Sequence, residues 1–206
     1  MTVHVHRVGT DALLVEVDTV ARAEALHAEV LRRVETGRLT AVDVVPAART
    51  VLLDGLADRE RHAREIPSWS VPDVGEASGP VVEIPVRYDG PDVGDVAAAW
   101  GVDVADVARL HQEPTYRVAF GGFAPGFGYL TGLPPDRSVP RRASPRTEVP
   151  AGSVALAGEF TGVYPRASPG GWQIVGTAVG VTLWDVARTP PALLVPGAQV
   201  RFREVR

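Results

Sequence analysis

The stretch Gly121–Pro134 reads GGFAPGFGYLTGLP, and it opens a segment that is unusually rich in glycine and proline. Between Gly121 and Trp172, 18 of 52 residues are Gly or Pro, about three times the roughly 12% of average usage. Glycine permits positive φ and proline fixes φ, so the mixture predicts a rigid, irregular surface made mostly of shaped loops. Such loops often carry binding sites, but they also turn the corners of barrels, and both interpretations stay open here.

Short apolar runs around this segment predict a β-rich domain. A strand is expected at Val81–Tyr88, followed by two short helices at Asp92–Trp100 and Asp103–Gln112, each opened by an aspartate suited to N-capping. The remaining strand candidates, separated by turn residues, are Tyr116–Phe120, Ser153–Leu156, Trp172–Val175, Val179–Trp184 and Gln199–Val205. Many short strands without a long helix indicate a compact β-barrel or sandwich.

The N-terminal part has a different pattern. Its expected order is β-β-α-β-β-α, which predicts a small α+β domain over residues 1–75. The clearest helix starts at Asp18 or Thr19 and ends at Gly37. The other elements are a hairpin of Val3–Val8 and Ala12–Val17, strands at Val42–Val45 and Thr50–Leu53, and a helix at Asp58–Ile66 that Pro67 ends. The Pro-, Gly- and Ser-rich stretch Ser70–Pro80 predicts a linker before a second domain at 80–206.

Composition excludes several kinds of chemistry. The chain has no cysteine, and all 21 of its basic residues are arginine, so disulfides, thiolate chemistry and a Walker-type lysine are ruled out. A formal net charge of −4 with mixed signs argues against nucleic-acid binding. No window reaches the roughly 20 apolar residues of a membrane span, so we expect a cytoplasmic protein. His4 and His6 have no third ligand at a suggestive spacing, and no metal site is predicted.

Three sequence motifs, in a fixed order along the chain, resemble those of a known family. They are GGFAPGFGYLTGLP at 121–134, PRRASPRTEVPAGSVALAG at 140–158 and TGVYPRASPGGWQIVG at 161–176. Together they resemble the family named allophanate hydrolase subunit 1, also known as the B subunit of 5-oxoprolinase, which includes a Kip-type inhibitor of a sporulation histidine kinase. The resemblance implies an α+β N-terminal domain followed by a cyclophilin-like β-barrel.

The same resemblance implies an activity. It points to a hydrolase subunit, active only in complex, that takes part in ATP-dependent conversion of 5-oxo-L-proline to L-glutamate. ATP is expected at the level of the complex, and the implied partners are the C subunit of 5-oxoprolinase, which is an allophanate hydrolase subunit 2-like protein, and also the A subunit. The pocket for the small carboxylate substrate would be completed at the interface with the partner. Two alternatives stay open: a kinase-inhibitor binding module, and a carboxyltransferase or allophanate hydrolase-related subunit of urea metabolism.

Several residues at matching family positions are candidates for the site. His111, at the end of an expected helix, is the candidate proton carrier, although a histidine there also favours the helix dipole. Arg142 and Arg146 have rigid guanidinium forks that can hold a carboxylate, or that can tie loops down by salt bridges. The expected substrate-binding set is completed by Phe127, Tyr129, Ser153 and Tyr164.

One departure from the family pattern affects this site. The family usually carries Arg-Thr-Pro after the glycine that matches Gly176, whereas this chain has Thr177, Ala178 and Val179. Loss of an arginine would remove a charge-assisted contact to an anionic group. Whether Arg166 or Arg188 compensates is left open by the sequence.

Overall fold

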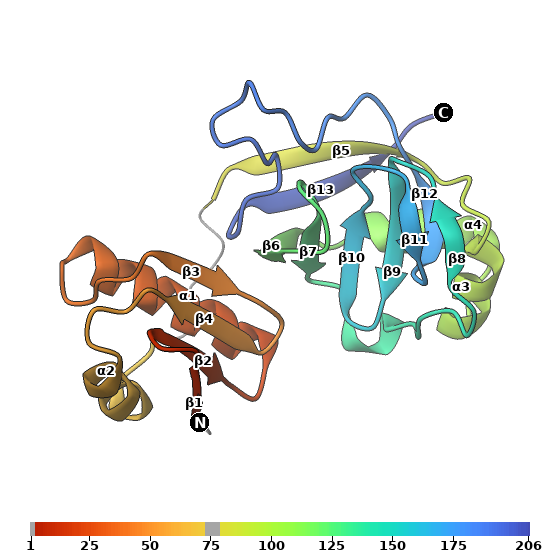
Figure 1. Cartoon of the computed structure of the whole chain (residues 1–206). Helices are drawn as coiled ribbons and strands as arrows, with labels where there is room; N and C mark the ends of the chain where they lie inside the picture. Colours follow the sequence, from red (N-terminus) through yellow and green to blue (C-terminus); the bar gives the residue numbers. More distant parts are fainter. Residues whose placement is uncertain (1–2, 73–78) are drawn as a thin grey trace. The chain divides into compact units, whose positions relative to one another are not determined.

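The computed structural model describes residues 3–72 and 79–206, and the chain divides into two compact units, Met1–Glu76 and Ala77–Arg206 (Figure 1). Each unit contains its own cluster of buried apolar side chains. The expected linker Ser70–Pro80 falls largely on residues 73–78, which lie outside the described residues. Within the described ranges, no helix is both long and apolar enough to cross a membrane.

The first unit is a four-stranded antiparallel sheet with helices. Its strand order is β1-β2-β4-β3, and α1 contacts β3 and β4. The elements are β1 (His4–Val8), β2 (Ala12–Glu16), α1 (Val20–Glu35), β3 (Asp43–Pro46), β4 (Thr50–Asp54), α2 (Arg59–Glu65) and the short 3₁₀ helix η1 (Ile66–Ser68).

Local sequence explains the main helix of this unit. The hydroxyl of Thr19 accepts a hydrogen bond from the Arg22 amide at 3.2 Å, which caps the first turn. Ala23, Leu26 and Val30 recur at helical spacing and are buried against the sheet core. This helix is therefore confirmed, and so is the expected hairpin, because β1 and β2 pair antiparallel from His4↔Glu16 to Val8↔Ala12. Pro67, expected to end the second helix, instead lies inside η1, because the first turn of a helix tolerates a missing amide.

The second unit is a closed barrel in which strands β10, β7, β6, β13, β5, β12 and β9 follow one another around the wall. This confirms the expected barrel fold. The elements are β5 (Val81–Arg87), α3 (Val93–Trp100), α4 (Val104–Gln112), β6 (Tyr116–Gly121), β7 (Gly128–Thr131), η2 (Pro135–Arg137), β8 (Arg146–Val149), β9 (Ser153–Ala157), β10 (Phe160–Val163), β11 (Ser168–Gly170), β12 (Gln173–Ala178) and β13 (Gln199–Glu204).

The barrel closes through one parallel pair. β13 runs parallel to β5, with Cα partners from Gln199↔Val81 to Glu204↔Val86, while the other neighbouring strands of the barrel are antiparallel (Figure 1). β8 and β11 form a separate two-stranded sheet.

Two expectations for this unit have different outcomes. The segment from Gly121 to Trp172 lies mostly outside helices and strands, as expected, but it also contains β7, β8, β10 and β11, which were not expected beside β9. Four of these strands are three or four residues long, too short to show an alternating pattern. Conversely, Val179–Trp184 forms no strand and has only an isolated bridge between Trp184 and Ala192. Gly180 has φ 68°, in the left-handed region, and this interrupts the extended backbone that a strand requires.

Candidate functional site

A pocket walled by aromatic rings lies on the barrel unit, and we call it the aromatic pocket. It encloses about 190 Å³. Its walls come from segments that are distant in the sequence, since Tyr129 lies on β7, Tyr164 directly follows β10 and Trp172 directly precedes β12. The lining residues are Phe123, Phe127, Tyr129, Arg141, Tyr164, Gly170, Gly171 and Trp172.

Phe127 organises the walls. Its ring is buried and meets three neighbours edge to face, at centroid distances of 5.1 Å to Tyr129, 5.4 Å to Tyr164 and 5.4 Å to Trp172. Gly162 makes room for this ring, because a Cβ at that position would lie 2.9 Å from the Phe127 ring. The walls are therefore rigid before any ligand arrives.

Phe123 stands at the pocket with unusual backbone geometry. The backbone φ angle of Phe123 is 65°, and 58% of the surface of this residue is exposed to solvent. A non-glycine residue in the left-handed region costs about 1–3 kcal/mol, and such strain concentrates at ligand-binding sites. The Phe123 ring meets Phe127 at 5.3 Å and Tyr164 at 5.9 Å, both edge to face.

The polar groups of the pocket are two tyrosine hydroxyls and one guanidinium. Burial raises the pKa of Tyr129 and of Tyr164, while the positive charge of Arg141 acts in the opposite direction on both. Both hydroxyls therefore keep their protons at neutral pH. Arg141 is exposed, and among the described residues no hydrogen bond or ion pair engages its side chain.

The two arginines expected to bind substrate meet at Asp92 instead. Arg142 donates to one carboxylate oxygen at 2.6 Å, and Arg146 donates to both oxygens, at 2.8 and 2.9 Å. The Ile174 amide adds a third donor at 2.7 Å. Burial on its own raises the pKa of Asp92, yet the hydrogen bonds from Arg146 and Ile174 and both positive charges outweigh it, so the pKa lies below its ordinary value.

This arrangement corrects one expectation about the helices. Neither Asp92 nor Asp103 caps its helix through the side chain, and the buried carboxylate of Asp92 is directed to the arginines. The geometry matches the salt-bridge alternative for Arg142 and Arg146. The function of this cluster is then to hold the 142–146 segment against β12 and the start of α3.

His111 lies in the barrel interior. It is fully buried, and its Nδ1 is 2.8 Å from the Tyr88 hydroxyl while its Nε2 is 3.1 Å from Oγ1 of Thr161. Because the Thr161 hydroxyl donates to the Ala155 carbonyl, it accepts from Nε2–H, and Nδ1 accepts from Tyr88. Burial lowers the pKa of His111 to about 3. In this conformation the ring is a neutral member of the core with both nitrogens occupied, and it has no contact with solvent.

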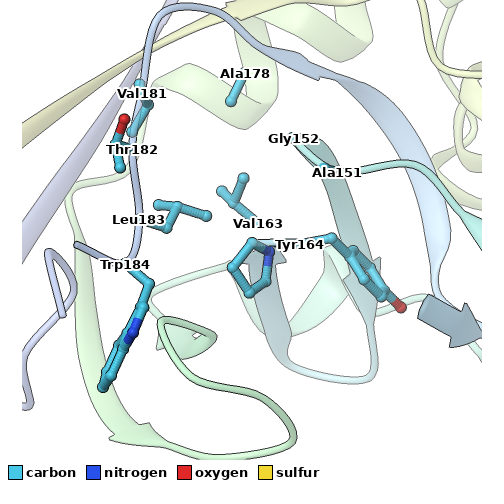
Figure 2. A pocket seen from close by; sticks show the side chains of 10 residues that line it. Ala151, Gly152, Val163, Tyr164, Ala178, Val181, Thr182, Leu183 and Trp184 are labelled. Carbon is cyan, nitrogen blue, oxygen red and sulfur yellow. The ribbon is translucent and has the colours of Figure 1, made fainter. Parts of the chain in front are cut away.

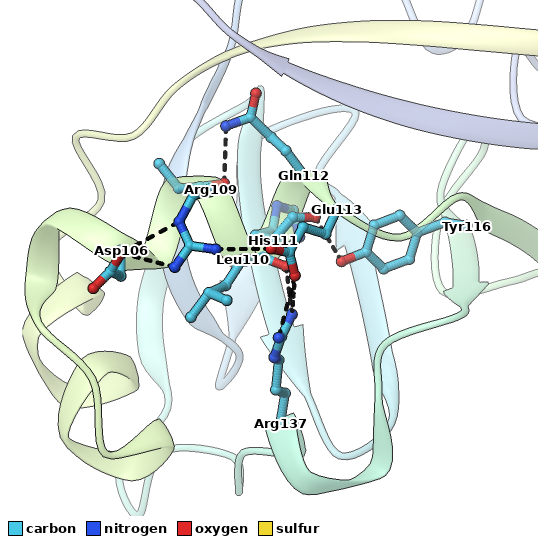
Figure 3. A network of polar contacts seen from close by, with 9 residues as sticks. Asp106, Arg109, Leu110, His111, Gln112, Glu113, Tyr116 and Arg137 are labelled. Carbon is cyan, nitrogen blue, oxygen red and sulfur yellow. Dashed lines mark hydrogen bonds and ion pairs between the residues drawn. The ribbon is translucent and has the colours of Figure 1, made fainter.

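The end of α4 around His111 is fastened by charged groups (Figure 3). Arg109 bonds Asp106 and Glu113 at 2.9 and 2.8 Å. Arg137 donates to the Leu110 carbonyl at 2.8 Å and to Glu113 at 3.2 Å. These contacts join the helix end to η2, so the polar cluster beside His111 is structural.

Tyr164 also lines a second cavity, of about 330 Å³, in which its ring points away from Trp184 (Figure 2). Its walls include the side chains of Val163, Leu183 and Trp184. Ser153, an expected substrate-binding residue, is buried in β9 and lines neither cavity. The residues around this cavity are Ala151, Gly152, Val163, Tyr164, Pro165, Ala178, Val181, Thr182, Leu183 and Trp184.

The structure also shows what occupies the position where the family usually has arginine. The Thr177 hydroxyl donates to Asp89 at 2.9 Å, and Asp89 pairs with Arg87 at 2.6 Å. Arg87 is the cross-strand partner of Thr177, so a guanidinium remains beside this position. Arg188 donates to the carbonyls of the 182–191 loop, whereas Arg166 lines a further cavity of about 360 Å³.

Sequence reasoning and structure agree in part on the site. Phe127, Tyr129 and Tyr164 come together, while His111, Ser153 and the Arg142–Arg146 pair lie outside the aromatic pocket. Sequence reasoning missed Phe123, Arg141 and Trp172 as lining residues and Asp92 as the group that orders the arginines. Trp172 stood in the resembling motif, but adjacent arginines in PRRASPR carry no local signal that tells the free one from the paired ones. No group of three or more acidic or histidine side chains suited to a metal ion occurs in the described part of the chain.

The chain is a two-domain protein in which a small α+β unit precedes a closed barrel. The family model "Carboxyltransferase domain, subdomain C and D" matches residues 3–194. The chain belongs to this family, and it is similar to three proteins named as 5-oxoprolinase B subunits. It is 48% identical over 137 residues to the 5-oxoprolinase B subunit of Escherichia coli, covering 65% of this chain and 62% of that protein. The chain thus spans about three-fifths of that relative.

Solved structures agree with the fold. A conserved uncharacterized protein from Pyrococcus horikoshii is 32% identical, with a TM-score of 0.58 and coverage of 98% of this chain and 97% of that one. Urea carboxylase from Kluyveromyces lactis is 19% identical, with a TM-score of 0.74 over 99% of this chain and 22% of that one. The second similarity shows the shared fold alone.

Proposed function

We propose that this chain is one subunit of an ATP-dependent 5-oxoprolinase that converts 5-oxo-L-proline to L-glutamate, and that it works only in complex. The similar E. coli protein is named as the B subunit of 5-oxoprolinase, which supports a hydrolase made of several subunits. The observation that carries the proposal is the aromatic pocket, in which rigid rings surround a space of small-molecule size beside the Arg141 guanidinium, which pairs with no side chain among the described residues. In this assignment a barrel protein of the C-subunit type, together with the A subunit, would complete the active site.

The chemistry explains why several subunits are needed. A lactam is an unreactive amide, so its carbonyl must be activated before water adds. The aromatic pocket does not fit ATP, because it offers about 190 Å³ and one guanidinium for a triphosphate nucleotide, whereas pockets for drug-sized ligands span roughly 300–1,000 Å³. We therefore assign nucleotide binding to a partner, and we assign to this chain the binding and orientation of the small substrate.

The test is reconstitution. The chain is co-expressed with candidate partner proteins of the A-subunit and C-subunit types, and the complex is purified through a tag on this chain. Glutamate release from 5-oxoproline is then measured with and without ATP. We expect ATP-dependent release by the complex and none by the chain alone. A complex that forms but does not release glutamate overturns the proposal, as does full activity of the isolated chain.

The family description names a carboxyltransferase domain, which supports a second candidate, a carboxyltransferase-related subunit; urea is the substrate that we would test for it. The same purified complex distinguishes the two. Transfer of a carboxyl group from carboxybiotin to urea, with no glutamate release from 5-oxoproline, would establish the second candidate.

A further inference from the structure

Arg141 differs from the nearby arginines Arg142 and Arg146 in its ion pairing. Arg142 and Arg146 are committed to Asp92, whereas nothing in the described ranges 3–72 and 79–206 pairs with the Arg141 side chain. Its guanidinium nevertheless lines a pocket whose other walls are rings and glycines. An unpaired cation beside apolar walls is the arrangement that recognises an anion attached to an apolar body.

The backbone around Arg141 is fixed. The Arg142 amide donates to the Gly171 carbonyl at 2.8 Å, and the Gln173 side chain donates to the Pro140 carbonyl at 3.3 Å. These bonds fasten the residues on both sides of Arg141 to the segment that carries Trp172. Asp92 strengthens the same attachment through Arg142 and Ile174. The guanidinium thus starts from a backbone whose position is set before a ligand binds.

We propose that the aromatic pocket binds a small cyclic monocarboxylate, with Arg141 pairing with its carboxylate and the rings of Phe127 and Trp172 contacting its ring. This inference rests on the proposed function, and it names the group by which this chain recognises 5-oxoproline. The guanidinium fork matches a carboxylate with two parallel hydrogen bonds.

Two further features fit this ligand class. Burial raises the pKa of Tyr129 and Tyr164, so both hydroxyls keep a proton that can be donated to an anion. The volume of about 190 Å³ lies below the roughly 300–1,000 Å³ of pockets for drug-sized ligands, which selects a single small ring. Phe123 contacts Phe127 and Tyr164 from the exposed side, where its ring can cover a bound ligand.

The test is calorimetric titration of the full chain with 5-oxoproline and with 2-pyrrolidinone, which is the same ring without the carboxylate. We expect 5-oxoproline to bind, and Arg141→Gln to weaken it by about 10- to 100-fold, the loss of one charge-assisted pair. Binding of 2-pyrrolidinone should be weaker in the native chain and unchanged by Arg141→Gln. Arg203→Gln, at an exposed arginine of β13 that does not line the pocket, is the matched control.

The outcomes separate this inference from the proposed function. Equal affinity of the native chain and Arg141→Gln for 5-oxoproline overturns the inference, even when the complex releases glutamate. Failure of the native chain to bind any member of a panel of 5-oxoproline, proline, 2-furoate and benzoate also overturns it. Arg141-dependent binding of 2-furoate or benzoate without 5-oxoproline binding supports the carboxylate site and counts against the 5-oxoprolinase assignment.

Discussion

Arg146 binds Asp92 through both terminal nitrogens of its guanidinium, donating to Oδ2 at 2.9 Å and to Oδ1 at 2.8 Å. Asp92 is buried, and it precedes α3, whereas Arg146 begins β8. The pair therefore joins two segments separated by more than fifty residues. Since Arg142 shares the same carboxylate, this one ion cluster fixes the backbone that directly follows Arg141.

Asp92→Asn should destabilise the barrel. An amide cannot neutralise two arginines, and loss of one partner from a buried ionic cluster leaves uncompensated charge, so we expect the free energy of unfolding to fall by about 3 kcal/mol. Urea denaturation checks the value. Asp95→Asn, at an exposed position of the same helix, is the control and should change stability by less than about 0.5 kcal/mol. A stability of Asp92→Asn equal to the control would contradict the role given to the cluster.

His111 should make the barrel sensitive to acid. Its pKa of about 3 in the folded chain lies below the ordinary value of 6.5, so the unfolded chain binds a proton more readily. Stability is then complete above about pH 6.5 and falls by about 1.4 kcal/mol per pH unit toward pH 3.

The control for this pH effect comes from the distribution of histidines. His111 is the one histidine of residues 77–206, and the other four precede residue 77. We expect His111→Gln to reduce the slope of barrel stability between pH 6.5 and 4, and His4→Gln, at an exposed position, to leave it unchanged. If the native chain and His111→Gln show the same dependence of barrel stability on pH, His111 is not a neutral buried ring in the folded chain.

Gly162→Ala should disturb the aromatic pocket. The new Cβ would approach the Phe127 ring to 2.9 Å and the Trp172 ring to 3.2 Å, so the rings must shift. Overpacking of this kind costs about 1–3 kcal/mol, and 5-oxoproline binding should be lost with it. Gly94→Ala is the control, because a Cβ there meets nothing within 4 Å. Calorimetry and urea denaturation of both variants provide the comparison; unchanged binding by Gly162→Ala would show that the rings do not form the site.

Two variants of Phe123 distinguish the effect of backbone strain on stability from the contribution of the ring to ligand binding. Phe123→Gly and Phe123→Ala both remove the ring, but only glycine relieves the positive φ of 65°. We expect the glycine variant to be about 1 kcal/mol more stable than the alanine variant, with both binding 5-oxoproline more weakly than the native chain. Thermal denaturation and calorimetry measure the two effects. Native affinity in both variants would exclude Phe123 from the ligand contact.

Local elements of this protein followed from the sequence. The strands β1 and β2 alternate or run apolar on either side of a short turn, and α1 has a capping threonine, helical spacing and a glycine at φ 68° after its end. Short-range rules suffice for these, because the interactions that define them lie within a few residues. The motifs around Gly121–Trp172 also identified the family through resemblance, and three residues expected to bind substrate, Phe127, Tyr129 and Tyr164, line one pocket.

Only the tertiary structure decided which polar groups are free. Arg141, Arg142 and Arg146 have the same chemistry and stand within six residues, yet the position of Asp92, fifty residues earlier, occupies two of them and leaves the third beside the pocket. In the sequence, His111 is a candidate proton carrier at the end of a helix. Only the closed barrel shows that its ring is buried and bonded to Tyr88 and Thr161. Burial and ion pairing depend on contacts between distant segments, so the pattern of neighbouring residues cannot specify them.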